Sequence, residues 1–116
     1  MNLVDDLRSY IAALEAAGQL AMVSKPVSLE YELADVAAAL ERSNTGAALF
    51  SSVTDSPWPI FSGGVASHRR AALALGCQPI EIPDVMGRVL EPENGVAPVR
   101  VTTAQWHDNQ VTGDDI

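Results

Sequence analysis

An apolar strand, a glycine turn and a helix follow one another without a break over residues 58–76. The strand begins as Trp58-Pro59-Ile60-Phe61, and the pair Gly63-Gly64 separates it from a helix rich in alanine and leucine. Ser67 is a typical N-cap residue for that helix, and Gly76 is typical of the position that ends one. Strand and helix must be buried against a shared core, so the remainder of the chain has to supply the other layers.

The rest of the chain shows the same alternation of helical and extended segments. Apolar residues at helical spacing predict three further helices, over residues 5–17, 29–43 and 84–90. Ser28 is the expected cap of the second of these, and Pro83 suits the first position of the third. On the second helix, Glu41 is among the charged residues that we expect to point away from the core.

Strands are predicted where apolar or alternating runs lie between turn residues. These runs cover residues 19–24, 47–53, 58–62 and 99–102, and an extended piece between two prolines covers residues 80–82. We therefore expect an α+β fold in which three to four helices pack on a small mixed or antiparallel sheet. At 116 residues the chain has the length of one domain, which we place over residues 1–116.

The composition excludes several classes of partner. A formal net charge of −8 argues against nucleic acid and against an anionic membrane surface, because both require clustered lysine and arginine. Cys77 is the only cysteine, so neither an internal disulfide nor a cysteine-based metal cluster is available. No apolar run approaches the ~18 residues of a membrane span, and the N-terminus lacks a basic segment before an apolar one. We expect a cytoplasmic protein.

The glycine turn has some features of a phosphate site. Glycines precede a helix N-terminus, and Arg69 and Arg70 lie in the first turn of that helix. However, neither the P-loop pattern nor G-x-G-x-x-G is present. The alternative is a tight turn capped by Ser67, with the arginines paired locally, solvated or in contact with a partner.

No set of residues is complete enough for catalysis or metal binding. His68 and His107 are the only histidines, and no nucleophile elbow of the form G-x-S-x-G accompanies them. His107 with Asp108 is at best a fragment of a metal site, and the acidic pairs near the C-terminus lie among polar turn residues. We therefore assign no catalytic, cofactor-binding or metal-binding residue to this chain.

Several motifs, taken in order, resemble one family. Residues 7–20, LRSYIAALEAAGQL, are similar to the opening LR-x-[FY]-[IL]-x-x-L-E-x-x-G-x-L of the UbiD-like decarboxylases. Residues 59–76, PIFSGGVASHRRAALALG, resemble the family's P-[VI]-x-x-[GN]-x-[FV]-[GA]-S-x-x-R-x-A-x-A-L-G. Residues 109–116, NQVTGDDI, resemble the run just before its D-L-x-x-L-P element. The resemblance covers nearly the whole chain in the same order.

The resemblance implies a role without implying a catalytic residue. Family members are much longer, and they decarboxylate or reversibly carboxylate aromatic and α,β-unsaturated acids with prenylated flavin mononucleotide, a divalent metal such as manganese, and potassium. Their Glu–Arg–Glu set and their cofactor ligands lie in a central domain, and no position here matches those motifs. The resemblance is therefore to the N-terminal domain only, which we expect to bind no cofactor alone and to support a catalytic chain or the remainder of the same polypeptide.

An N-terminal domain of this kind is expected to expose an apolar patch where it meets its partner. The candidate interface residues are Trp58, Phe61, Val65, Arg69, Arg70 and Trp106. Two other hypotheses remain open at this point. One is a stand-alone binding or assembly module without lyase activity. The other is a small phosphate-ligand protein that uses residues 62–70.

Overall fold

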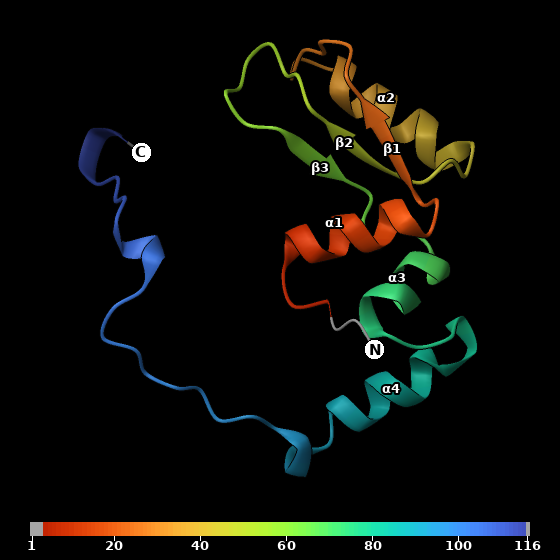
Figure 1. Cartoon of the computed structure of the whole chain (residues 1–116), viewed down its shortest axis with the longest axis vertical. Helices are drawn as coiled ribbons and strands as arrows, with labels where there is room; N and C mark the ends of the chain where they lie inside the picture. Colours follow the sequence, from red (N-terminus) through yellow and green to blue (C-terminus); the bar gives the residue numbers. More distant parts are fainter. Residues whose placement is uncertain (1–3, 116) are drawn as a thin grey trace.

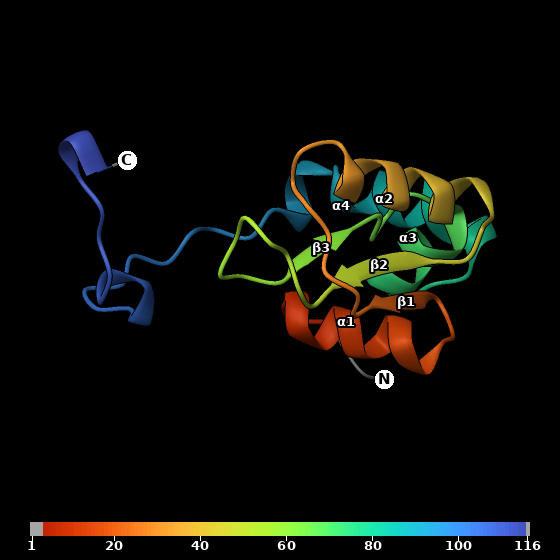
Figure 2. The same cartoon turned by 90° about the horizontal axis from the view of Figure 1, so that it is seen from above.

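A three-stranded sheet lies between helices in the computed structural model, which describes residues 4–115 (Figures 1 and 2). Residues 1–3 and 116, which the predicted domain includes, lie outside the described residues. Strand β1 (Leu20–Val23) runs parallel to β2 (Ala47–Phe50), and β3 (Ile60–Ser62) runs antiparallel to β2. The sheet is therefore mixed, with β2 at its centre. Together with four α-helices it confirms the predicted α+β fold.

The two faces of β2 are buried by different helices. Ala48 and Phe50 belong to a core cluster with Leu33, Val36 and Leu40 of α2 (Glu32–Arg42). Ala47 belongs to a second cluster with Tyr10 and Leu14 of α1 (Leu7–Ala16) and with Leu73 of α3 (His68–Leu75). Figure 2 shows the resulting layers, with α2 on one side of the sheet and α1 on the other. This division follows from the alternation of side chains along a strand.

Local capping signals set the ends of α1 and α3. Asp6 caps α1: its carboxylate accepts the Ser9 amide proton at 2.7 Å, which places the helix start at Leu7. Ser67 caps α3 by accepting the Arg70 amide proton at 3.2 Å. Gly76 ends that helix in the left-handed conformation, where a side chain would be disfavoured. These ends agree with the sequence predictions to within two residues.

The start of α2 differs from the prediction. Ser28 is not its cap, because the helix begins four residues later, after Tyr31, whose φ is +65°. The Asp55 carboxylate accepts hydrogen bonds from the Ser28 hydroxyl at 2.9 Å and from the Leu29 amide at 3.0 Å. This contact ties Ser28 and Leu29 to the loop after β2, and residues 29–31 form a turn before the helix starts at Glu32.

Two extended segments of the prediction are also wrong. Residues 79–81 form a single 3₁₀ turn, Pro79–Glu81, that leads directly into α4 (Ile82–Val89). The Glu81 side chain accepts the Gln78 amide proton at 2.7 Å and so favours the turn. Residues 99–102 form no regular secondary structure and pair with no strand in the described part of the chain.

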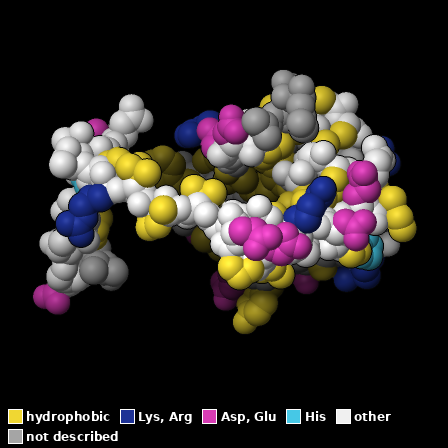
Figure 3. All heavy atoms as spheres, turned by 90° about the horizontal axis from the view of Figure 1, so that it is seen from below, with side chains coloured by type: hydrophobic (Ala, Val, Ile, Leu, Met, Phe, Trp, Pro, Cys, Tyr) yellow, Lys and Arg dark blue, Asp and Glu magenta, His cyan; other side chains and the backbone are white. Residues whose placement is uncertain are grey.

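The C-terminal segment, residues 95–115, leads away from the body and contains two single 3₁₀ turns, Gln105–His107 and Gly113–Asp115 (Figures 1 and 3). Every buried side chain among the described residues lies between Tyr10 and Ala72. The radius of gyration is 17.5 Å, whereas a compact domain of this length has about 13 Å. Figure 3 shows hydrophobic side chains along the recess between the segment and the body. Our assignment of residues 1–116 to one domain stays a prediction.

Candidate functional site

Arg70, in the first turn of α3, is the most deeply buried charged residue in the described part of the chain. Its side chain is 1% exposed and forms a bidentate ion pair with Glu41 at the end of α2, with both N–O distances 2.8 Å. The same guanidinium donates to the Gly63 carbonyl at 2.8 Å and to the Ser67 hydroxyl at 3.0 Å. Arg70 thus joins α2, the glycine turn and its own helix cap.

The glycine pair lets the backbone close over this ion pair. Gly63 has φ +77°, and a Cβ atom at this position would overlap the Glu41 carboxylate oxygen. A Cβ atom at Gly64 would lie 2.8 Å from the Phe61 ring. Both positions therefore require glycine for close approach, and Gly63 requires it for its backbone conformation as well. The two glycines serve a packing purpose in this turn.

Tyr10 connects α1 to the same cluster. Its hydroxyl lies 2.5 Å from the Gly64 carbonyl and 2.8 Å from the Arg70 carbonyl, and it shares its one proton between the two oxygens. The Tyr10 ring packs edge-on against Phe61, with centroids 6.5 Å apart. We call Tyr10, Glu41, Gly63, Gly64, Ser67 and Arg70 the Arg70 cluster.

The environment shifts two pKa values within the Arg70 cluster. Hydrogen bonds from Arg70 outweigh the opposing effect of burial and, with the arginine charge, hold the pKa of Glu41 below its usual value. Burial raises the pKa of the Tyr10 phenol, and the nearby Arg70 charge opposes that rise only in part. At neutral pH the cluster therefore contains an ionised carboxylate and a neutral phenol.

This arrangement does not fit an anion site. The Glu41 carboxylate already occupies the position that a bound phosphate would take, and its oxygens accept both terminal nitrogens of Arg70. The interpretation of residues 62–70 as a phosphate cradle is therefore wrong for Arg70. The sequence also placed Glu41 on the outer face of its helix, whereas the carboxylate points to Arg70. Two signals were available: the arginine pair in a segment otherwise rich in alanine and leucine, and the arginine that the family pattern S-x-x-R places at Arg70.

The family of the chain follows from its sequence between α1 and the end of α4. Residues 11–90 match the family described as the 3-octaprenyl-4-hydroxybenzoate carboxy-lyase N-terminal domain, UbiD_N. The chain belongs to the UbiD_N family. The matched residues include every member of the Arg70 cluster except Tyr10, which lies one position before them.

Solved decarboxylases contain the same UbiD_N fold. A 3,4-dihydroxybenzoic acid decarboxylase from Enterobacter cloacae, in its apo structure, is 36% identical to this chain and matches it with a TM-score of 0.71. The match covers 84% of this chain and 22% of the decarboxylase chain. A Sedimentibacter hydroxybenzoicus vanillic acid decarboxylase in open form is 26% identical to this chain and matches it with a TM-score of 0.62. The match covers 68% of this chain and 18% of the decarboxylase chain. The chain therefore spans about a fifth of the length of the decarboxylases it matches.

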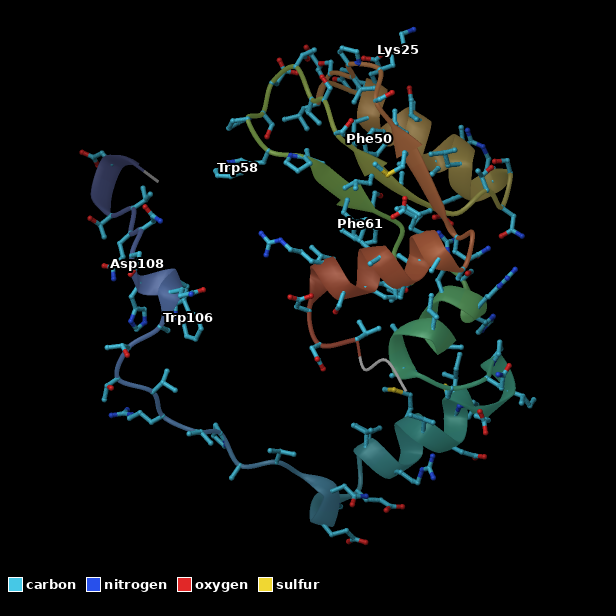
Figure 4. The ribbon with its side chains drawn as sticks, in the orientation of Figure 1. Lys25, Phe50, Trp58, Phe61, Trp106 and Asp108 are labelled. Carbon is cyan, nitrogen blue, oxygen red and sulfur yellow. The ribbon has the colours of Figure 1, made fainter. Side chains whose placement is uncertain are left out.

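The predicted interface residues of this UbiD_N chain do not all lie on its surface. Trp58, Val65 and Trp106 are 73%, 68% and 72% exposed. Phe61 is half-buried and, with Leu7, lines a groove of about 450 Å³ between α1 and the sheet. In Figure 4, Trp58 projects from the loop before β3 on the side of the C-terminal segment, and Trp106 points from that segment toward the body.

Arg70 must be separated from the other interface candidates. Of the alternatives for the two arginines (local pairing, a solvated helix end or the rim of an interface), Arg70 adopts local pairing, and only Arg69 is exposed. Arg70 turns inward because Glu41, Ser67 and Gly63 accept its hydrogen bonds, which compensates for the cost of burying its charge. The interface assignment of the remaining candidates stays a prediction.

The described residues offer little to a cofactor or a metal ion. Between residues 4 and 115 no group of three or more His, Cys, Asp or Glu side chains is placed to hold a metal. His68 and His107 are both exposed, and His107 packs edge-on against Trp106. Among residues 4–115, no helix is long and apolar enough to cross a membrane. Because the Arg70 charge is already paired with the Glu41 carboxylate, the cluster does not fit a flavin phosphate either.

Proposed function

We propose that this chain is the N-terminal domain or small subunit of a UbiD-like decarboxylase or carboxylase that acts on aromatic or α,β-unsaturated carboxylic acids. Its role is structural, and the reaction takes place in a catalytic part that belongs to a separate chain or to the same polypeptide. The UbiD_N match over residues 11–90 is the observation that carries this proposal. The likeness to a 3,4-dihydroxybenzoic acid decarboxylase at 36% identity supports an aromatic acid as substrate.

The Arg70 cluster supports a structural role for the chain. Its charged and hydroxyl groups are satisfied by one another, so they stabilise the packing of α1, α2 and α3 instead of meeting a substrate. Prenylated flavin mononucleotide, the divalent metal and potassium then belong to the catalytic part. No step of the reaction is assigned to residues of this chain.

The contact with the catalytic part is proposed to use Trp58, Phe61, Val65, Arg69 and Trp106. Exposed aromatic side chains are common anchors of protein interfaces, and the groove beside Phe61 offers a concave apolar site next to one. An arginine at the edge of such a patch pairs readily with carboxylates of a partner.

Co-purification tests this function directly. The tagged chain, in the length in which its cell produces it, is recovered from native extract, and the accompanying polypeptide is identified by mass spectrometry. We expect a flavin-containing decarboxylase sequence, either in a second chain or in the same one. Recovery of a well-behaved monomer alone would favour a stand-alone binding or assembly module.

Two measurements refine the result. The isolated chain, mixed with prenylated flavin mononucleotide and desalted, is expected to retain no stoichiometric flavin absorbance. Replacing Trp58 with alanine is expected to weaken association with the catalytic part. The control is Tyr31→Ala, because Tyr31 is equally exposed but lies at the start of α2, on the opposite side of the sheet from the groove.

A further inference from the structure

The chain exposes more surface than a compact protein of its mass. Its accessible surface is 9083 Å², whereas a folded monomer of 12.3 kDa has about 6,100 Å². The difference of roughly 3,000 Å² exceeds the ~800 Å² that each partner buries in an interface of standard size. It also exceeds the roughly 1,000–2,500 Å² that each partner buries in most obligate interfaces. The groove beside Phe61 is too small to account for it.

Part of this surface is the outer half of α4. Its apolar residues recur at helical spacing as Ile82, Val85, Met86, Val89 and Leu90. Ile82 and Val85 are half-buried where α4 packs against α3, but the stripe continues past that contact. Val89 is 60% and Leu90 is 76% exposed. A helix with one apolar face normally buries that face against another element.

The start of the C-terminal segment meets this apolar surface at the end of α4. Val89 and Val96 line one shallow depression of about 530 Å³ together with Val85, Arg88 and Asn94, and Val99 follows three residues after Val96, 85% exposed. Asn94 fixes the turn between α4 and the segment, because its amide donates to the Arg88 carbonyl at 2.7 Å. This hydrogen bond fixes the turn that links the helix end to the segment before any partner binds, and an ordered turn lowers the entropic cost of binding.

We propose that the last turn of α4 and the start of the C-terminal segment form a clamp, defined by Met86, Val89, Leu90, Val96 and Val99. The clamp docks on an apolar, convex surface of the catalytic part and is a second contact, separate from the groove beside Phe61. This inference rests on the proposed function. It adds an interface that includes none of the residues named from the sequence.

Charge argues against a second copy as the occupant. Each chain carries a formal net charge of −8, so two copies that enclosed one another would bring like charges together over a large area. A partner domain whose contact surface is apolar and not acidic avoids this repulsion. The extent of the uncovered surface also favours a folded domain over a short peptide.

Hydrogen exchange measured by mass spectrometry tests the clamp in the intact assembly of this chain with its catalytic part, whether they are one polypeptide or two. We expect amides of residues 86–101 to exchange at least tenfold more slowly in the assembly than in the isolated chain. The double substitution Val89→Gln and Leu90→Gln is expected to abolish this protection. In a two-chain assembly it should also weaken binding at least tenfold.

The control is Met22→Gln on β1, which removes a comparably exposed apolar side chain away from α4 and should leave exchange and affinity unchanged. If the assembly forms, Trp58→Ala weakens it and residues 86–101 remain unprotected, the clamp is wrong while the proposed function stands. If no catalytic part associates at all, both proposals fall. If the isolated chain is a dimer that the double substitution dissociates, the occupant is a second copy and the clamp proposal is overturned.

Discussion

Replacing Glu41 with glutamine preserves the shape of the side chain but removes the negative charge that faces Arg70. The Arg70 guanidinium is 1% exposed, so water cannot replace the lost carboxylate. One glutamine oxygen still accepts a hydrogen bond, but the amide nitrogen then faces the other terminal nitrogen of Arg70, and two donors meet. The result is a buried positive charge whose acceptors, the glutamine oxygen, the Gly63 carbonyl and the Ser67 hydroxyl, are all neutral.

The expected loss of stability is large for a chain of this size. Breaking a buried ion pair on one side costs about 3–5 kcal/mol, and a hydrogen bond to a charged group contributes about 1.5–3 kcal/mol. The Glu41 side chain is 31% exposed, so solvent already screens part of the attraction. We therefore expect a decrease of about 2–3 kcal/mol in the free energy of unfolding, with a Tm lower by roughly 10 °C.

Urea denaturation of the purified chain, followed by circular dichroism, measures this loss. The matched control is Glu15→Gln, an exposed glutamate on α1 without a hydrogen-bond partner among the described side chains, which should change stability by less than about 0.5 kcal/mol. If Glu41→Gln unfolds at the same urea concentration as the control, the Arg70 cluster does not stabilise the fold and the reasoning is refuted.

The pH dependence gives an independent check on the ion pair. The pKa of Glu41 is lower in the folded state, so the unfolded chain binds the proton more readily. Stabilisation by this group is therefore complete above the unfolded-state pKa and is lost as the pH falls through the folded-state pKa. The difference in stability between the unmodified chain and Glu41→Gln should be largest near neutral pH and should shrink as the solution is acidified. A difference that stays constant with pH would contradict this.

Three further substitutions test neighbouring features. Gly63→Ala should lower the free energy of unfolding by about 2 kcal/mol or more, because its φ is +77° and the new Cβ atom displaces Glu41. Gly87→Ala, in α4, should instead raise the free energy of unfolding by about 0.5–1 kcal/mol in the same urea titration, because a Cβ atom there meets no other atom within 4 Å. Tyr10→Phe should lower the free energy of unfolding by about 1–2 kcal/mol, because it removes the hydroxyl that bonds to the Gly64 and Arg70 carbonyls. Absorbance titration of the unmodified chain should show a pKa of Tyr10 above the usual value of a phenol. Asp55→Ala should speed hydrogen exchange of the Leu29 amide, and unchanged exchange would show that the turn before α2 does not depend on Asp55.

Residues close together in the sequence were sufficient to predict α1 and α3. Their apolar spacing, the N-cap Ser67 and the stop Gly76 act within one or two helical turns, so the flanking residues carry the information. The α+β class followed in the same way from the order of helical and extended segments. The motifs that resemble the UbiD-like decarboxylases are short local patterns of this kind, and the match over residues 11–90 confirmed the family.

The tertiary structure determined which charged and polar groups meet. Glu41 and Arg70 lie 29 positions apart in the sequence, and Tyr10 lies 60 positions before Arg70, so neither partner is visible in local spacing. Likewise the turn at Ser28 is hydrogen-bonded to the distant Asp55, and residues 99–102 have the pattern of a strand but no strand to pair with among residues 4–115. Capping and periodicity depend on nearby residues, whereas ion pairs and strand pairing need a second segment that only folding brings close.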